Sequence, residues 1–322
     1  MRVTNSMLSK SFLRDLNRNQ SNLKKINSQL ASGKEISRPS DDPYKVARSM
    51  QLNSDIKAAT QYNENIKDTT NWLDTTDTAL QQLENSFQRI RELMVSSGNA
   101  AYGVDEKKAI KDEINEKVNE IAQILNTNFD GKYIFGGTKV NSKPVIVGSD
   151  VTGNNKLYFG SSEGTIITDP SESNEVKMLA SDLMVEISQG VTMKYNVSAT
   201  EILEFGEEPN KVNVMNLLTD ITNSLDSEDS SEVAGKLLGQ MDSTISNLLK
   251  IMSEVGSKQN RMESAATQNE DQILNLKDVL SKTEDIDFAE KTIEATVAQT
   301  VYMASLQVSA RIIQPTLLDF LR

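Results

Sequence analysis

The chain has 322 residues, no cysteine and no histidine, and its 46 Asp and Glu against 34 Lys and Arg give a net charge of -12. This balance argues against nucleic acid and anionic membrane surfaces as partners, because both favour clustered basic charge. The missing residue types exclude disulfides and cysteine-bound zinc, and they remove the commonest general base and metal ligand. We therefore expect a protein that is not an enzyme and that carries no cofactor.

A seven-residue apolar repeat marks the beginning of the chain. Its spacing of 3.5 residues is what a contact between two helices requires. Asn19 is a polar member of the repeat, and Gly33 ends it, as suits the left-handed position after a helix. The stretch has no apolar core of a secretory signal, so no cleavable signal peptide is expected. The apolar members are Phe12, Leu16, Leu23, Ile26 and Leu30.

The stretch SQLASGKEISRPSDDPYKV, from Ser28 to Val46, reads as a connector to the next helix. Asp42 is a candidate N-cap, and Pro43 suits the first helical position because its missing N–H costs nothing there. A metal held by Asp41 and Asp42 alone would lack ligands. The sequence therefore favours a joint between helices over a chemical site.

A longer helix follows, with an apolar residue every seven positions until Ser96-Ser97-Gly98 breaks the pattern. Asp105 is then the expected cap of a third helix. From Phe129 onward, short β-rich runs such as VIVG, KLYFG and GVTMKYNV alternate with Gly, Asn, Asp and Pro, which is typical of strands and turns. The seven-residue repeat comprises Leu52, Ala59, Ile66, Leu73, Leu80, Phe87 and Met94.

Helix returns after about residue 211, and heptads resume near Ile245, with Gln259 and Asn269 as polar members. The last segment keeps apolar residues at intervals of three and four, has no charge from Ala295 to Ala310, and ends before Pro315. No window of 18 or more apolar residues occurs, so no bilayer-spanning helix and no membrane insertion are expected.

These elements predict a mainly α fold with an inserted all-β domain, built as an elongated antiparallel helical bundle or coiled coil that pairs the N- and C-terminal segments. Three domains are expected. Residues 1–40 with 285–322 form a terminal coiled-coil assembly domain, 41–130 with 211–284 form a long-helix bundle, and 131–210 form a β-rich inserted domain.

Three stretches carry a resemblance to a known family. SQLASGKEISRPSDDP near the start, VGSKQNRMES at 255–264 and EDIDFAEKTIEATVAQTVYMASLQVSARI from Glu284 resemble the terminal elements of the bacterial flagellin superfamily. Within it, LNTNFDGKYIFGGTK and the closing QPTLLDFLR are more similar to the hook–filament junction branch, the third hook-associated proteins, than to filament flagellins.

This resemblance implies an extracellular structural adaptor of the flagellum that joins hook to filament as a ring of subunits. It also implies export without a cleavable signal peptide, other hook-associated proteins and flagellin as neighbours, and an export chaperone on the C-terminal helix. The expected assembly interface lies on the terminal helices and comprises Phe12, Leu16, Leu23, Ile26, Leu30, Ile293, Val297, Val301, Ala304, Val308 and Ile312.

Three alternatives stay open at this point. The chain could be flagellin itself, polymerising without limit, or a tip or translocator protein of a type III injection system that binds host membrane. An enzyme carried in the insertion would need carboxylates, and the candidates are Asp169, Glu172, Glu175 and Asp182. Solvated loop charge explains these four better, because no partner base accompanies them. The acidic run DSEDSSE at 226–232 lacks the EF-hand glycine and terminal Glu, so no calcium site is predicted.

Overall fold

The computed structural model describes residues 5–36, 38–98, 103–150, 153–167, 173–206, 211–226 and 233–312. Contacts divide the chain into two units. The terminal unit combines Met1–Ala59 with Asp271–Arg322, and the central unit is Thr60–Glu270. The three domains expected from the sequence have boundaries that differ from those of these two units, and the three-domain division stays a prediction.

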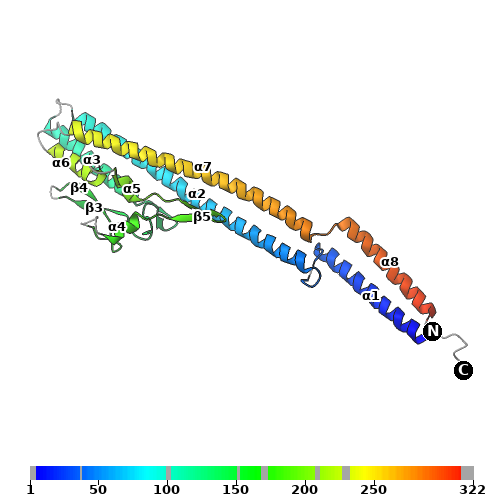
Figure 1. Cartoon of the computed structure of the whole chain (residues 1–322). Helices are drawn as coiled ribbons and strands as arrows, with labels where there is room; N and C mark the ends of the chain where they lie inside the picture. Colours follow the sequence, from blue (N-terminus) through cyan, green and yellow to red (C-terminus); the bar gives the residue numbers. More distant parts are fainter. Residues whose placement is uncertain are drawn as a thin grey trace, which may run out of the picture. The chain divides into compact units, whose positions relative to one another are not determined.

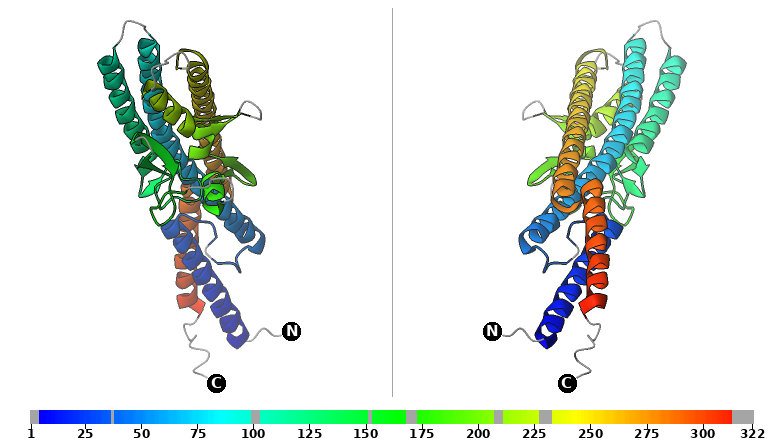
Figure 2. Two further views of the ribbon diagram at one scale, coloured as in Figure 1. Left: turned by 90° about the vertical axis from the view of Figure 1, so that its left-hand side faces the viewer. Right: turned by 90° about the vertical axis from the view of Figure 1, so that its right-hand side faces the viewer.

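Two antiparallel helices dominate the terminal unit. Helix α1 (Asn5–Ser32) lies beside α8 (Phe288–Ile312) in every view (Figures 1 and 2). The amide of Asn19 donates to the Ser305 hydroxyl at 3.4 Å, so the polar seam residue on α1 has a partner on α8. A single polar pair in an apolar seam is a recognised way to fix register. The predicted pairing of the two chain ends is therefore confirmed.

Aspartate caps begin two of the helices. Helix α2 (Pro43–Ser97) starts after Asp42, whose Oδ1 accepts from the backbone N–H groups of Tyr44 and Lys45 at 3.1 Å each. Asp287 does the same for α8, accepting from Ala289 N at 2.8 Å and Glu290 N at 3.2 Å. The capping role predicted for Asp42 is confirmed.

The central unit is built on long helices with a continuous apolar core. Helix α2 continues there, with α3 (Val104–Leu125), α6 (Val214–Asp226) and α7 (Leu238–Glu284). A short π-helix, η1 (Val233–Leu237), precedes α7. All seven members of the α2 repeat are buried, because the heptad keeps them on one face of the helix.

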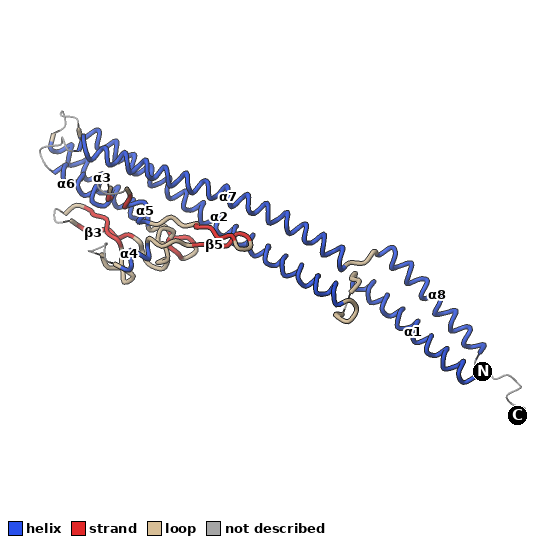
Figure 3. The backbone as a smooth tube through the Cα atoms, viewed as in Figure 1, coloured by secondary structure: helices blue, strands red, loops and turns tan. Residues whose placement is uncertain are grey.

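The strands form four separate two-stranded antiparallel sheets, seen as short red segments in Figure 3. They are β1 (Asn128–Phe129) with β2 (Lys132–Tyr133), β3 (Val145–Ser149) with β4 (Asn155–Phe159), β5 (Met184–Ser188) with β6 (Val191–Lys194), and β7 (Glu204–Phe205) with β8 (Val212–Asn213). The strand-rich insertion is therefore confirmed, and its core is shared with the helices.

The insertion also holds two short helices, so it is not made of strands alone. Helix α4 (Asn174–Leu179) starts after Ser173, which accepts from Glu175 N. Helix α5 (Ala199–Leu203) starts with a capping box between Ser198 and Glu201. The S-x-x-E spacing of this capping box is visible in the sequence, but the β-rich runs on either side of it predict strands instead of a helix.

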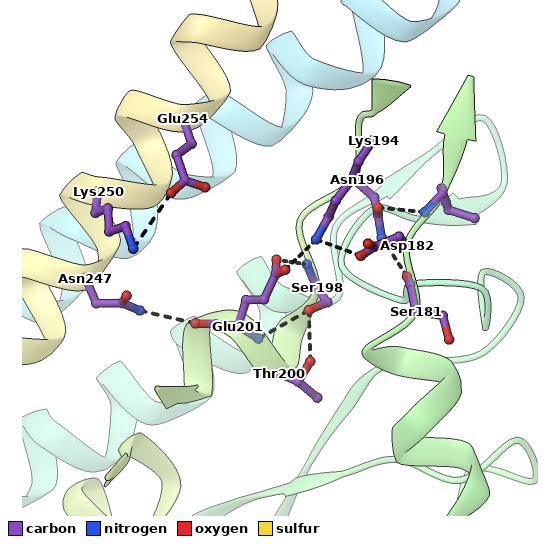
Figure 4. A network of polar contacts seen from close by, with 11 residues as sticks. Ser181, Asp182, Lys194, Asn196, Ser198, Thr200, Glu201, Asn247, Lys250 and Glu254 are labelled. Atoms are coloured by element: carbon purple, nitrogen blue, oxygen red, sulfur yellow. Dashed lines mark hydrogen bonds and ion pairs between the residues drawn. The ribbon is translucent and has the colours of Figure 1, made fainter. Parts of the chain in front are cut away.

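A polar network joins the insertion to α7 (Figure 4). The Lys194 ammonium bridges Asp182 at 2.7 Å and Glu201 at 2.6 Å. The Asn247 amide on α7 donates to the Glu201 carbonyl at 3.2 Å. Because the Glu201 side chain also closes the α5 capping box, one residue links strand β6, helix α5 and helix α7, through its carboxylate to the first two and through its backbone carbonyl to α7.

Polar residues within the long helices also have defined partners. Gln259 on α7 donates to Asp74 on α2 at 2.8 Å, and Arg91 on α2 forms an ion pair with Asp242 on α7. The two contacts are separated by the same number of residues on α2 as on α7. Within the central unit the two helices therefore run antiparallel in a constant register. Asn269 is buried and donates to the Ile187 carbonyl of β5 at 2.8 Å.

The α2 seam provides a test of the core. Leu73→Ala should lower the free energy of unfolding by about 2–5 kcal/mol, because Leu73 is fully buried and the substitution leaves a cavity. Asn85→Ala on the exposed side of the same helix is the matched control and should change stability little. Thermal and denaturant unfolding of both variants measure this. Equal melting of the Leu73 variant and the parent would contradict the assigned packing.

Candidate assembly surface

The predicted interface residues on α1 lie on one half-buried face. This face repeats at intervals of four and three, while most of the rest of the helix is exposed. Because α8 is the element that packs along α1, we assign this face to the contact inside the subunit. It comprises Phe12, Leu16, Asn19, Leu23, Ile26 and Leu30.

Helix α8 meets α1 with small and polar residues instead of its branched apolar ones. Its half-buried positions also repeat at intervals of four and three, which is the spacing of a helix contact. Ser305 is one of them and receives the Asn19 hydrogen bond. The face comprises Lys291, Ala295, Ala298, Tyr302, Ser305 and Ser309.

The residues predicted on α8 form a second, separate stripe on another side of that helix. Ile293, Val297, Val301 and Val308 are 66%, 57%, 46% and 49% exposed, and Ala304 between them is also exposed. Ile312 is the last residue of α8, and its side chain lies outside the described part of the chain. The structure thus brings the α1 set into a contact within the subunit and leaves the α8 set uncovered. We name the latter the α8 stripe.

Sequence reasoning missed the face of α8 that meets α1. The signal was present as the regular spacing of Ala295, Ala298, Ser305 and Ser309, but small residues at heptad positions are easily passed over beside valine and isoleucine. Small side chains let two helices approach closely, so they suit a tight pair.

A groove of about 620 Å³ runs between α1 and α8 beside the α8 stripe. Its apolar lining comes from Ile26 on α1 and from Ile293, Val297 and Val301 on α8. Charged groups line it as well, including an ion pair of Lys291 with Glu294 at 2.8 Å. The bond to Glu294 raises the pKa of Lys291, so this lysine stays charged at neutral pH. The groove is therefore an apolar strip with charged flanks.

A hydrogen-bonded joint lies where α1 ends and α8 begins. Gly33 has φ +72°, a conformation that glycine adopts without strain. Its carbonyl accepts from Ile286 N at 3.1 Å, and Glu35 N donates to the Glu284 carbonyl at 2.6 Å. The Glu284 side chain is buried, and its carboxylate pairs with the Lys34 ammonium and accepts from the Ser49 hydroxyl. The connector between α1 and α2 is thereby tied to the connector between α7 and α8.

Of the carboxylates considered for an enzyme, the two that the structure describes, Glu175 and Asp182, make separate contacts. Glu175 pairs with Lys139 at 2.9 Å and accepts from Ser162 N at 2.7 Å, and the Lys139 bond is the larger cause of its lowered pKa. Asp182 belongs to the Lys194 network. Asp169 and Glu172 lie outside the described residues, as does most of the acidic run 226–232.

Neither a metal cluster nor a membrane span appears within the described ranges. No group of three or more Asp or Glu side chains there is arranged to hold a metal ion. No described helix is long and apolar enough to cross a bilayer.

Two family models match the segments that build these helices. Residues 3–140 match the bacterial flagellin N-terminal helical region, and residues 238–321 match the bacterial flagellin C-terminal helical region. Together they cover more than half of the chain. The chain belongs to the bacterial flagellin family. The predicted family is therefore confirmed, and its members are structural proteins of the flagellum, not enzymes.

Curated relatives of the chain are flagellins. It is 31% identical to a flagellin of Clostridium tyrobutyricum over 44% of this chain and 37% of the relative. It is 32% identical to the phase 1 flagellin of Salmonella naestved over 52% of this chain and 31% of the relative. These matches therefore span only about a third of the relatives' own lengths.

Solved structures of hook-associated proteins share the fold. A putative flagellar hook-associated protein from Vibrio parahaemolyticus has a TM-score of 0.61 at 21% identity, covering 76% of this chain and 100% of that one. Flagellar hook associated protein-3 from Legionella pneumophila has a TM-score of 0.57 at 14% identity, covering 74% and 98%. FlgL from Bacillus cereus has a TM-score of 0.51 at 21% identity, covering 72% and 99%.

The joint can be tested through Glu284. Glu284→Ala should speed hydrogen exchange at the Ile286 and Glu35 amides and destabilise the terminal unit by about 1–3 kcal/mol, because Lys34 and Ser49 lose a shared acceptor. Glu263→Ala, an exposed glutamate on the same helix, is the control. Unchanged exchange at both amides in the Glu284 variant would show that this carboxylate does not hold the joint.

Proposed function

We propose that this chain is the structural adaptor between the hook and the filament of a bacterial flagellum, and that its subunits form a ring through their terminal helices. The observation that carries the proposal is the α8 stripe. Four branched apolar side chains on one side of α8 are about half exposed or more in the isolated subunit. Exposed apolar surface of this kind is characteristic of protein interfaces.

The shape of the α1–α8 pair supports interdigitation of neighbouring copies. The groove beside the α8 stripe has both apolar and polar lining residues, and its volume of about 620 Å³ leaves room for side chains from a second subunit. The flanking Lys25, Glu35 and Glu294 carry charges of both signs, which could fix the orientation of the neighbour. The proposed interface is the predicted set of terminal-helix residues. The α1 residues hold α1 and α8 together within the subunit, and the α8 stripe contacts the neighbouring subunit.

The shared fold supports the adaptor role. The solved hook-associated proteins from Vibrio parahaemolyticus and Legionella pneumophila are matched over 100% and 98% of their lengths, with TM-scores of 0.61 and 0.57. Flagellin is the second candidate, because the curated relatives at 31% and 32% identity are flagellins.

Under this proposal the neighbours are other hook-associated proteins on one side and flagellin on the other. The chain would leave the cell through the flagellar export channel without a cleaved signal peptide. Before assembly an export chaperone would cover the C-terminal helix, where the uncharged stretch from Ala295 to Ala310 would otherwise meet water.

Val301→Asp tests the proposed interface. The variant should leave the melting temperature of the isolated subunit unchanged, because Val301 is 46% exposed there. It should abolish swimming, because a buried unpaired carboxylate at a subunit contact carries a large desolvation penalty. The matched control is Gln299→Asp, which puts the same charge on an exposed position of α8 on another side of the helix from the stripe.

Motility of cells carrying each variant, together with immunolabelling of the flagellum, gives the result. Normal swimming with the Val301→Asp subunit incorporated would exclude the α8 stripe as the interface. The position of the immunolabel along the flagellum distinguishes the adaptor from flagellin. Label confined to the boundary of hook and filament supports the adaptor, and label along the filament, or unlimited polymerisation of the purified subunit, supports flagellin.

A further inference from the structure

A cavity of about 550 Å³ lies within the central unit. Helix α2 contributes Asp68, Asn71 and Trp72 to its wall, and the β1–β2 hairpin contributes residues at and beside its tip. Tyr195, directly after β6, closes the third side. Three segments far apart in the sequence therefore meet around one hollow.

Aromatic rings form part of the wall. Phe129 and Tyr195 stand almost perpendicular to Trp72, with centroids 6.1 and 5.8 Å away and interplanar angles of 85° and 86°. Trp72 is buried, whereas Phe129 and Tyr195 are only half-buried. Aromatic residues make up only 5% of the chain, so three in contact at one cavity are a marked concentration.

The hairpin presents its charged residues from a rigid turn. Asp130 and Gly131 have φ of 50° and 77°, the pair of positive angles of a type I′ turn, for which Asp-Gly is a preferred sequence. The Asn128 side chain accepts from Gly131 N at 2.9 Å and further holds the tip. The positions of Asp130 and Lys132 at the cavity are therefore set by local backbone geometry.

Four exposed polar side chains around the cavity are available to a ligand. Asp68, Asn71, Asp130 and Lys132 make no ion pair or side-chain hydrogen bond with any described residue. Thr69, which also lines the cavity, is satisfied, because its hydroxyl donates to the Asn65 carbonyl at 2.7 Å.

We propose that this cavity binds a pyranose unit of a neutral polysaccharide. Sugar hydroxyls both donate and accept, so they can use the carboxylates of Asp68 and Asp130 together with the donors of Asn71 and Lys132. The C–H faces of a pyranose ring pack on aromatic rings such as those of Phe129 and Tyr195. A cationic ligand would meet the like charge of Lys132, and an apolar ligand would leave both carboxylates without donors.

This site is independent of the proposed assembly role. The α8 stripe belongs to the terminal unit, and no residue of the cavity belongs to it. An adaptor with this cavity would have a sugar-binding function besides its structural one.

Trp72 is the only tryptophan, so its fluorescence reports on the cavity in the full-length chain. We expect glucose, galactose or N-acetylglucosamine to change the fluorescence saturably, with a Kd on the order of 1 mM for the best of the three. Saturation-transfer NMR gives a second readout on the sugar protons. Asp68→Ala should weaken binding about tenfold, the effect of losing one charge-assisted hydrogen bond.

Two further variants sharpen the test. Asp130→Asn should also weaken binding, and asparagine tolerates the positive φ of the turn, so the hairpin stays folded. Asp112→Ala removes an exposed aspartate of α3 outside the cavity and should bind like the parent. The proposal is overturned if none of the sugars binds saturably, if the Asp68 and Asp130 variants bind like the parent, or if methylguanidinium binds in their place with the same aspartate dependence.

Discussion

Pairing of a helix from the first half of the chain with one from the second half is the constraint on which everything else depends. Apolar heptads supply the attraction between α2 and α7, and the apolar face of α1 packs on the small residues of α8, but such seams alone tolerate slippage by a whole repeat. Polar side chains at or beside the seams remove that freedom. Asn19 with Ser305 sets the outer pair, and Gln259 with Asp74 sets the inner one. Polar residues in an apolar seam lower its stability, but they restrict the two helices to a single register.

Helix α8 separates two tasks on two of its sides. The side toward α1 carries alanine and serine, which pack closely within the subunit, while the valines and isoleucine remain on the outside. The most apolar side chains of α8 are not buried within its own subunit. They become buried only when another molecule packs against this side of the helix. The joint at Glu284 complements this arrangement, since it holds the connectors of the pair by hydrogen bonds that do not involve the stripe.

Features set by local spacing could be predicted from the sequence. The α2 seam from Leu52 to Met94, the cap at Asp42 and the pairing of the chain ends all follow from periodicity and capping chemistry, which act over a few residues. The two sides of α8 could not be separated, because hydrophobicity alone does not say which stripe meets α1. The cavity at Trp72 was also out of reach, because α2, the β1–β2 hairpin and Tyr195 come together only through tertiary packing.

Three asparagines of the long helices bond to main-chain carbonyls of the insertion. Asn65 and Asn269 donate to the carbonyls of Glu186 and Ile187, and Asn247 donates to that of Glu201. A carbonyl oxygen is present whatever side chain its residue carries. These three bonds therefore place no demand on the exposed side chains of the β5–β6 hairpin, such as Met184 and Val191, which can change while this attachment to the helices is preserved.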